Sequence, residues 1–354
     1  MNKSLVVLPF LLLSLLAAIW TGLIRIGWPW PLPEAAGQHG ALMVGSFLSS
    51  LVFLERAVTF KQKWVLLLPV INVSSGVFFL LQQQQTAILM LVIGSAGFLI
   101  MCSYFIYRYK ELYYYVFWAG AFALLIGYIV LWQQQFYPAV VPWWMAFLLF
   151  TIVAERLELS RFLPLKQSQR TTLLVILSML LASLFIPFHK GGQLLFPLAV
   201  MGTAIWLLRY DMAWRSIHIP GQHRYSAWLL ITGYVWLLAT GMLLLVSEEF
   251  PFGYDGALHS FFIGFTFSMI FSHAPIIFPA LVKLPLKLYR PILYAWFALL
   301  QVSLLLRVAS DLLGFVRMRQ YSGLLNGVAM LAFFVTIAVI VRIELKKRRL
   351  SRVA

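Results

Sequence analysis

Residues 5–27 read LVVLPFLLLSLLAAIWTGLIRIG, and this stretch decides the class of fold. Its only charged residue is Arg25, and a helix that crosses the hydrocarbon core of a bilayer needs about 20 mainly apolar residues. A signal peptide has a shorter apolar region, of roughly 7–15 residues, followed by a cleavage site of small residues. No clean site of that kind follows here, so we interpret the stretch as a retained first transmembrane helix.

The composition extends this interpretation to the whole chain. Of 354 residues, 62% are apolar and 11% are charged, whereas a soluble domain carries roughly a quarter charged residues. The excess apolar surface must face lipid. The net charge of +16 does not indicate nucleic acid as a partner, because the basic residues lie in short loops between apolar runs. Cys102, the only cysteine, excludes an internal disulfide framework.

Similar apolar stretches recur along the chain and predict about twelve transmembrane helices. The candidates are 5–27, 36–60, 64–81, 86–108, 113–133, 137–157, 172–188, 192–209, 226–247, 256–282, 289–313 and 321–343. The connections leave no room for a soluble domain. We therefore predict an all-α polytopic membrane protein in which residues 1–354 form a single transmembrane domain with membrane lipid as its partner.

The distribution of lysine and arginine predicts the orientation of these helices. Cytoplasmic loops of membrane proteins carry an excess of basic residues. If the twelve candidates alternate in direction, 22 of the 27 basic residues fall on the side of both termini, and the other five are Arg25, Lys190, Arg307, Arg317 and Arg319. We expect a bacterial cytoplasmic (inner) membrane protein with cytoplasmic N and C termini.

A short internal repeat accompanies this topology. Residues 47–56 read FLSSLVFLER, and residues 147–156 read FLLFTIVAER. The offset of 100 residues corresponds to four of the predicted helices, which indicates four-helix units. The Glu-Arg pairs that end the two segments are interpreted as structural ion pairs.

Two of the six histidines are candidate metal ligands. His39 and His259 fall near the outer ends of predicted helices 36–60 and 256–282, which run in the same direction. Histidines at similar depth on parallel helices suit one metal centre held between them, and nearby glycines would admit a flat macrocycle. Asp255 is the expected N-cap of the second helix. The alternative is that each histidine bonds a neighbour near the membrane surface.

The other histidines have simpler interpretations. His189, His218 and His223 lie in predicted loops. His273 lies 14 residues beyond His259, or about 21 Å along a helix, so it cannot share a metal ion with His259. It serves either a structural role beside Pro275 or a second site.

Arginines near the outer surface have two interpretations. Arg307 and Asp311 are four residues apart, as expected for an ion pair on one helix. Alternatively, Arg307, together with Arg25, neutralises the carboxylates of a bound cofactor.

The topology and these positions resemble subunit I of the haem–copper oxidases. In that family, helices 2 and 10 supply axial histidines to a low-spin haem, and arginines near helix 11 meet its propionates. His39, His259 and Arg307 match those places, and the family's four-helix arcs match the repeat. The segments HGALMVGSF (39–47) and ALHSFFIGF (257–265) are more similar to the NnrS group of haem–copper membrane proteins, which is associated with nitric oxide metabolism.

Departures from the oxidase pattern limit what the resemblance implies. The predicted helix 137–157 contains no histidine, and 172–188 lacks the paired histidines that would bind copper. A copper site of the oxidase kind is therefore not expected. The resemblance implies b-type haem held by His39 and His259, a redox or nitric-oxide-related role with a possible redox partner, and no oxidase turnover. A secondary transporter of a small solute and a cofactor-free assembly or scaffold protein stay open as alternatives.

Overall fold

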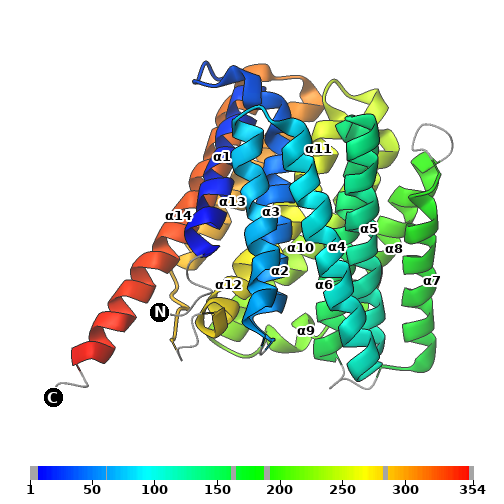
Figure 1. Ribbon diagram of the computed structural model, residues 1–354, viewed down its shortest axis with the longest axis vertical. Coiled ribbons are helices and arrows are strands. Elements are labelled where there is room, and N and C mark those ends of the chain that lie inside the picture. The colour runs from blue at the N-terminus through cyan, green and yellow to red at the C-terminus, as the bar shows by residue number, and fades with distance from the viewer. Residues whose placement is uncertain (1–6, 61, 161–164, 187–191, 282–285, 351–354) are drawn as a thin grey trace. The chain divides into compact units, whose positions relative to one another are not determined.

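The computed structural model describes residues 7–60, 62–160, 165–186, 192–281 and 286–350 (Figure 1). These residues are all-helical and contain no strand. By their contacts they form two compact units, residues 1–199 and 200–354. This division does not test the expected single transmembrane domain, which stays a prediction.

Eight helices in the described residues are long and apolar enough to cross a membrane. Two shorter apolar helices, Trp64–Leu80 and Leu194–Tyr210, coincide with further predicted spans. The helices are therefore compatible with a multi-pass membrane protein. The count of twelve and the arrangement in oxidase-like arcs stay predictions.

The first unit begins with the apolar helix α1 (Val7–Arg25). A segment of three helix types follows: η2 (Pro33–Gln38), η3 (Ala41–Leu48) and α2 (Ser49–Ala57). The remaining helices are η4 (Lys63–Leu66), α3 (Leu67–Leu80), α4 (Gln84–Tyr109), α5 (Leu112–Gln134), α6 (Tyr137–Ser160) and α7 (Gln167–Ser183). Helix α8 (Gly192–Tyr210) crosses the boundary of the two units.

The second unit contains a comparable segment of mixed helix types. Its helices are α9 (Ala213–Ser216), α10 (Gln222–Val246), η6 (Ser247–Glu249), α11 (Gly253–His259), η7 (Ser260–Phe267), α12 (Ser268–Leu281), α13 (Leu293–Leu313) and α14 (Val316–Leu350). Helix α13 packs along α14, and α10 packs along η7 and α12. The rings of Phe271 and Phe333 stack at 3.7 Å.

Both segments of mixed helix type contain an eight-residue π-helix, η3 and η7. The sequence predicted uninterrupted helices at 36–60 and 256–282, and π-helical turns are usually single and often mark functional sites. All eight residues of η3 are buried, as are seven of the eight in η7.

A buried hydrogen-bond cluster supports the first π-helix. The Asn72 side chain of α3 donates to the carbonyl oxygen of Gly45 at 2.8 Å and lies at the same distance from the hydroxyls of Ser49 and Ser50. Ser49 also donates to the Gly45 carbonyl. In a membrane interior a carbonyl without a partner is costly, so these donors stabilise the irregular backbone.

The repeat seen in the sequence corresponds to an ion pair in the structure. The Arg56 guanidinium lies 3.0 Å from the Glu155 carboxylate and stacks on the Phe117 ring at 4.6 Å. The structure thus pairs the arginine of one segment with the glutamate of the other, and this ion pair joins α2 to α6.

The predicted topology can be tested with reporter fusions. Because the basic residues are so unevenly distributed, fusions after Gln84, Gln135 and Phe252 should report the outside. Fusions after Lys63, Lys110 and Lys287 should report the cytoplasm. Alkaline phosphatase and fluorescent-protein activities measure the two sides. Two successive fusion points that report the same side would show that the predicted helix count is wrong.

Candidate functional site

His39 is held against the first helix. It follows η2, whose first turn contains Pro33. Its Nδ1 lies 2.8 Å from the carbonyl oxygen of Ala18 in α1. A carbonyl oxygen only accepts hydrogen bonds, so Nδ1 carries the proton, and in the neutral ring Nε2 keeps its lone pair. This is the tautomer that coordinates a metal through Nε2.

Gly22 makes this position of His39 possible. A Cβ atom at Gly22 would lie 2.7 Å from both Nδ1 and Cε1 of the His39 ring. The imidazole therefore packs directly on the α1 backbone, one turn after the carbonyl to which it donates. Helix α1 supplies both the acceptor and the space for this ring.

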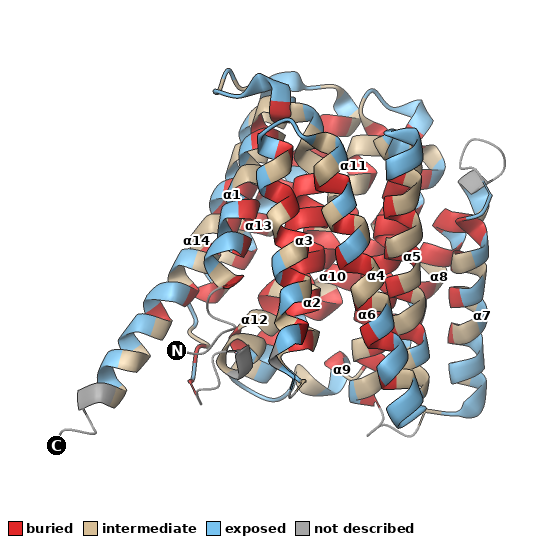
Figure 2. Ribbon diagram, viewed as in Figure 1, coloured by how far each residue is buried: buried red, intermediate tan, exposed pale blue. Residues whose placement is uncertain are grey.

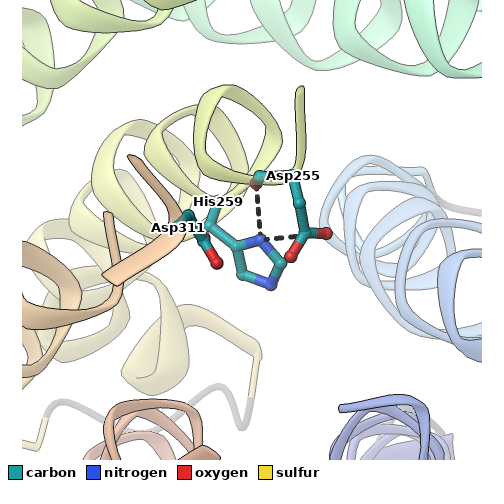
Figure 3. A group of neighbouring side chains, drawn as sticks. All are labelled: Asp255, His259 and Asp311. Atoms are coloured by element: carbon teal, nitrogen blue, oxygen red, sulfur yellow. Dashed lines mark hydrogen bonds and ion pairs between the residues drawn. The ribbon is translucent and has the colours of Figure 1, made fainter. Parts of the chain in front are cut away.

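His259 has the same hydrogen bond in the second unit. It is the last residue of α11, and its Nδ1 lies 2.8 Å from the carbonyl oxygen of Asp255, one turn earlier (Figure 3). The side chain is 21% exposed. Here too Nδ1 donates, and in the neutral ring Nε2 has the lone pair, as coordination through Nε2 requires.

Each histidine also lies just before a π-helix. His39 and Gly40 precede η3, and His259 precedes η7. Ser268, the residue directly after η7, donates to the carbonyl of Gly264 at 2.5 Å. Ser49, the residue directly after η3, donates to the carbonyl of Gly45 in the same way. The two units thus contain the same local arrangement: a histidine, a π-helix, and a serine bonded back to a glycine carbonyl.

A network of two carboxylates and two guanidinium groups lies beside His259. The Asp255 carboxylate is 2.5 Å from Arg307 and 2.6 Å from Arg319. The Asp311 carboxylate is 3.0 Å from Arg307 and 2.8 Å from Arg319. Asp311 is fully buried and the Arg307 side chain is 2% exposed. Charge-assisted bonds of this kind are the strong ones, and they tie α11, α13 and α14 together.

The neighbouring backbone contributes to the same junction. Phe252 donates from its amide to the Asp311 carbonyl at 3.1 Å, and its ring lies 4.3 Å from the Arg319 guanidinium carbon. The expected N-cap role of Asp255 is wrong: Phe252 occupies the N-cap position of α11, and Asp255 lies in the first turn. Its carboxylate binds the arginines, so it is not available to cap the helix.

Asp255, His259 and Asp311 bring ligand atoms within 4.8 Å of one another (Figure 3). This spacing resembles a metal site, but the two arginines balance the two carboxylates. A divalent cation would have to displace both guanidinium groups and would be repelled by them. We therefore interpret the group as an ion-pair network, which leaves only the imidazole of His259 as a candidate ligand.

The other predicted site residues have different surroundings. The expected Arg307–Asp311 ion pair is confirmed at 3.0 Å, while the contact of Arg307 with a cofactor stays a prediction. Arg25 is exposed at the end of α1. The space beside the glycines that follow the histidines contains protein side chains: Trp144 at Gly40, Leu91 at Gly45 and Trp236 at Gly264.

The remaining histidines fall outside these arrangements. His218 and His223 are exposed, and His273 lies in α12, beyond η7. His189 lies outside the described residues. Sequence reasoning missed Arg319 as a site residue. The spacing RMR at 317–319, directly after the turn that ends α13, is a signal only once α13 and α14 are known to form a hairpin.

These features define an all-helical protein whose long apolar helices indicate a membrane location and whose two units each contain a histidine with Nδ1 bonded to a backbone carbonyl. The chain belongs to the family described as Domain of unknown function (DUF8744), whose model matches residues 4–342. No curated protein and no solved structure matches the chain.

The packing of the His39 ring on Gly22 can be tested by a substitution that adds one methyl group at Gly22. Gly22→Ala forces the His39 ring away from α1 and should lower the free energy of unfolding by about 1–3 kcal/mol, as overpacking does. It should also shift the ¹⁵N resonance of His39 Nδ1 as the bond to Ala18 lengthens. Denaturation in detergent and NMR of histidine-labelled protein measure the two effects.

Gly37→Ala is the matched control for this substitution. A Cβ atom there meets nothing within 4 Å, so its stability and histidine spectrum should equal those of the wild type. Equal behaviour of the two alanine variants would contradict the packing of His39 on Gly22.

The ion-pair network predicts that replacing Arg319 lowers the stability of the protein strongly, whereas replacing Arg317 does not. Arg319→Gln leaves the buried Asp311 without one of its partners and should cost about 3–5 kcal/mol of unfolding free energy. Arg317→Gln, at an exposed position, should change it by less than about 0.5 kcal/mol. Thermal and denaturant unfolding give the values, and adding Asp311→Asn to Arg319→Gln should recover part of the loss.

Proposed function

We propose that this chain is an inner-membrane protein that binds b-type haem through His39 and His259. The role we propose is redox or related to nitric oxide, without oxidase turnover. The resemblance of segments 39–47 and 257–265 to NnrS-like proteins motivates this function.

One observation supports the proposal most directly. His39 and His259 both donate from Nδ1 to a backbone carbonyl at 2.8 Å. Metal-ligating histidines almost always bind a carbonyl or carboxylate through the nitrogen that does not hold the metal, which fixes the tautomer and the ring orientation. The first helix does this for His39, and the first turn of α11 does it for His259. An imidazole held in this way is a kind of ligand that haem iron takes.

The surroundings of His259 support a neutral imidazole ligand. The Asp255 carboxylate lies 3.6 Å from Nδ1 of His259, but two guanidinium groups bind it at 2.5 and 2.6 Å. Because the arginines engage its charge, this carboxylate stabilises a protonated, cationic imidazole less, which favours the neutral ring. In the neutral ring Nδ1 donates to the backbone carbonyl and Nε2 has the lone pair.

Bound haem would supply one-electron chemistry at the iron. Two imidazole ligands leave no open coordination position, which suits electron transfer or sensing better than oxygen reduction. The chain's own contribution is to hold each imidazole in one tautomer and to keep the charge beside His259 balanced.

An optical spectrum of the purified protein tests this function. Protein produced with haem supplied and purified in detergent should show a Soret band, and sharp visible bands on reduction. His39→Ala and His259→Ala should each lower the bound haem by at least about tenfold or convert it to a high-spin form. The pyridine haemochrome assay measures the haem content.

His218→Ala and His223→Ala are the controls, because both side chains are exposed. They should bind as much haem as the wild type. A colourless wild-type protein would refute haem binding. Unchanged haem and spectra in both His39→Ala and His259→Ala would refute the pair of ligands even if haem is bound.

A further inference from the structure

The last helix, α14, is longer than a bilayer requires. Its 35 residues extend about 52 Å, whereas the hydrocarbon core is about 30 Å thick. Residues 320–341 carry no charge, and the basic residues resume at Arg342. The uncharged run alone spans about 33 Å, so the end of α14 from Arg342 onward falls at the headgroup level. In Figure 1 this end continues away from the other helices of its unit.

One face of α14 is apolar and open along this run. Val335, Val339 and Ile343, which we call the α14 stripe, are 61%, 51% and 47% exposed. Figure 2 shows exposed residues recurring along α14. Residues three, four and seven apart share a face of a helix. Arg342 is seven residues after Val335, and Lys346 is seven after Val339, so both basic side chains lie at the end of the stripe. Both residues are exposed.

The charge at this end is strongly positive. Residues 342–349 contain Arg342, Lys346, Lys347, Arg348 and Arg349 against a single acid, Glu344. That acid is already paired: its carboxylate lies 2.7 Å from Arg290 and 3.5 Å from Lys347. Arg342 and Lys346 are thus not neutralised by Glu344, and a basic cluster directly after a transmembrane helix attracts anionic lipid.

We propose that Arg342 and Lys346 bind the phosphate of an anionic phospholipid whose acyl chains lie along the α14 stripe. A soluble anion would use only the charges, whereas a lipid uses the charges and the apolar face that leads to them. A zwitterionic lipid matches the apolar face but not the uncompensated charge. This site depends on the membrane location and not on haem.

Lipid selectivity of the full chain tests the proposal. The protein is reconstituted in phosphatidylcholine nanodiscs, and spin-labelled phosphatidylglycerol or spin-labelled phosphatidylcholine is added as the probe. The motionally restricted fraction of each probe is measured by electron paramagnetic resonance. The wild type should restrict the anionic probe in preference to the zwitterionic probe. In Arg342→Gln/Lys346→Gln this preference should fall by about tenfold.

Two controls distinguish a specific lipid site from general attraction of anionic lipid to the positively charged protein. Arg108→Gln/Lys110→Gln removes the same charge from exposed positions at the end of another helix, α4, and it should keep most of the preference. Arg342→Lys/Lys346→Arg keeps both charges and should restore it. Equal loss in the Arg108→Gln/Lys110→Gln variant, or no loss in the Arg342→Gln/Lys346→Gln variant, would overturn the site. Displacement of the anionic probe by millimolar inorganic phosphate would also overturn it, because the ligand would then be a free anion.

Discussion

Backbone amide and carbonyl groups inside a membrane find no water, so every one of them must be bonded within the protein. This constraint explains why the described chain is helical, and it also explains where the chain departs from regular helix. The π-helices η3 and η7 occur where serine and asparagine side chains can bond the irregular backbone. The two candidate ligands adjoin these segments, and their rings take backbone carbonyls as acceptors too. Satisfying carbonyl oxygens thus shapes both the fold and the site.

The sequence predicts the helical class because length and apolar composition decide it. The run 320–341 contains no charged residue, and it forms part of the single helix α14. The π-helices could not be predicted in this way. The hydropathy of Ala41–Leu48 does not depend on whether the segment forms an α-helix or a π-helix. The π-helix is stabilised by Asn72, which lies on another helix. The irregularity therefore depends on a tertiary contact that no local pattern records.

The candidate site, like the fold, could be predicted from the sequence only in part. His39, His259 and Arg307 could be selected because few polar residues lie in apolar segments. Their acceptors could not be selected, because the Ala18 carbonyl and the space at Gly22 belong to a helix that carries no chemical signal of its own. Asp255 was misplaced as an N-cap for a related reason. Local spacing favours capping, but two arginines from the α13–α14 hairpin compete for the same carboxylate and bind it more strongly.

That competition has a consequence for any metal held by His259. A carboxylate bonded to the Nδ1 proton makes an imidazole more basic and strengthens it as a ligand, whereas a backbone carbonyl does so less. Asp255 has both a carbonyl and a carboxylate near Nδ1 of His259. The two arginines bind the carboxylate at 2.5 and 2.6 Å and leave it 3.6 Å from Nδ1, so the carbonyl is the group that accepts the hydrogen bond. In the first unit His39 donates to a carbonyl of the mainly apolar helix α1. Both histidines thus bond a backbone carbonyl through Nδ1, and at His259 an arginine network also determines how strongly a carboxylate acts on the ring.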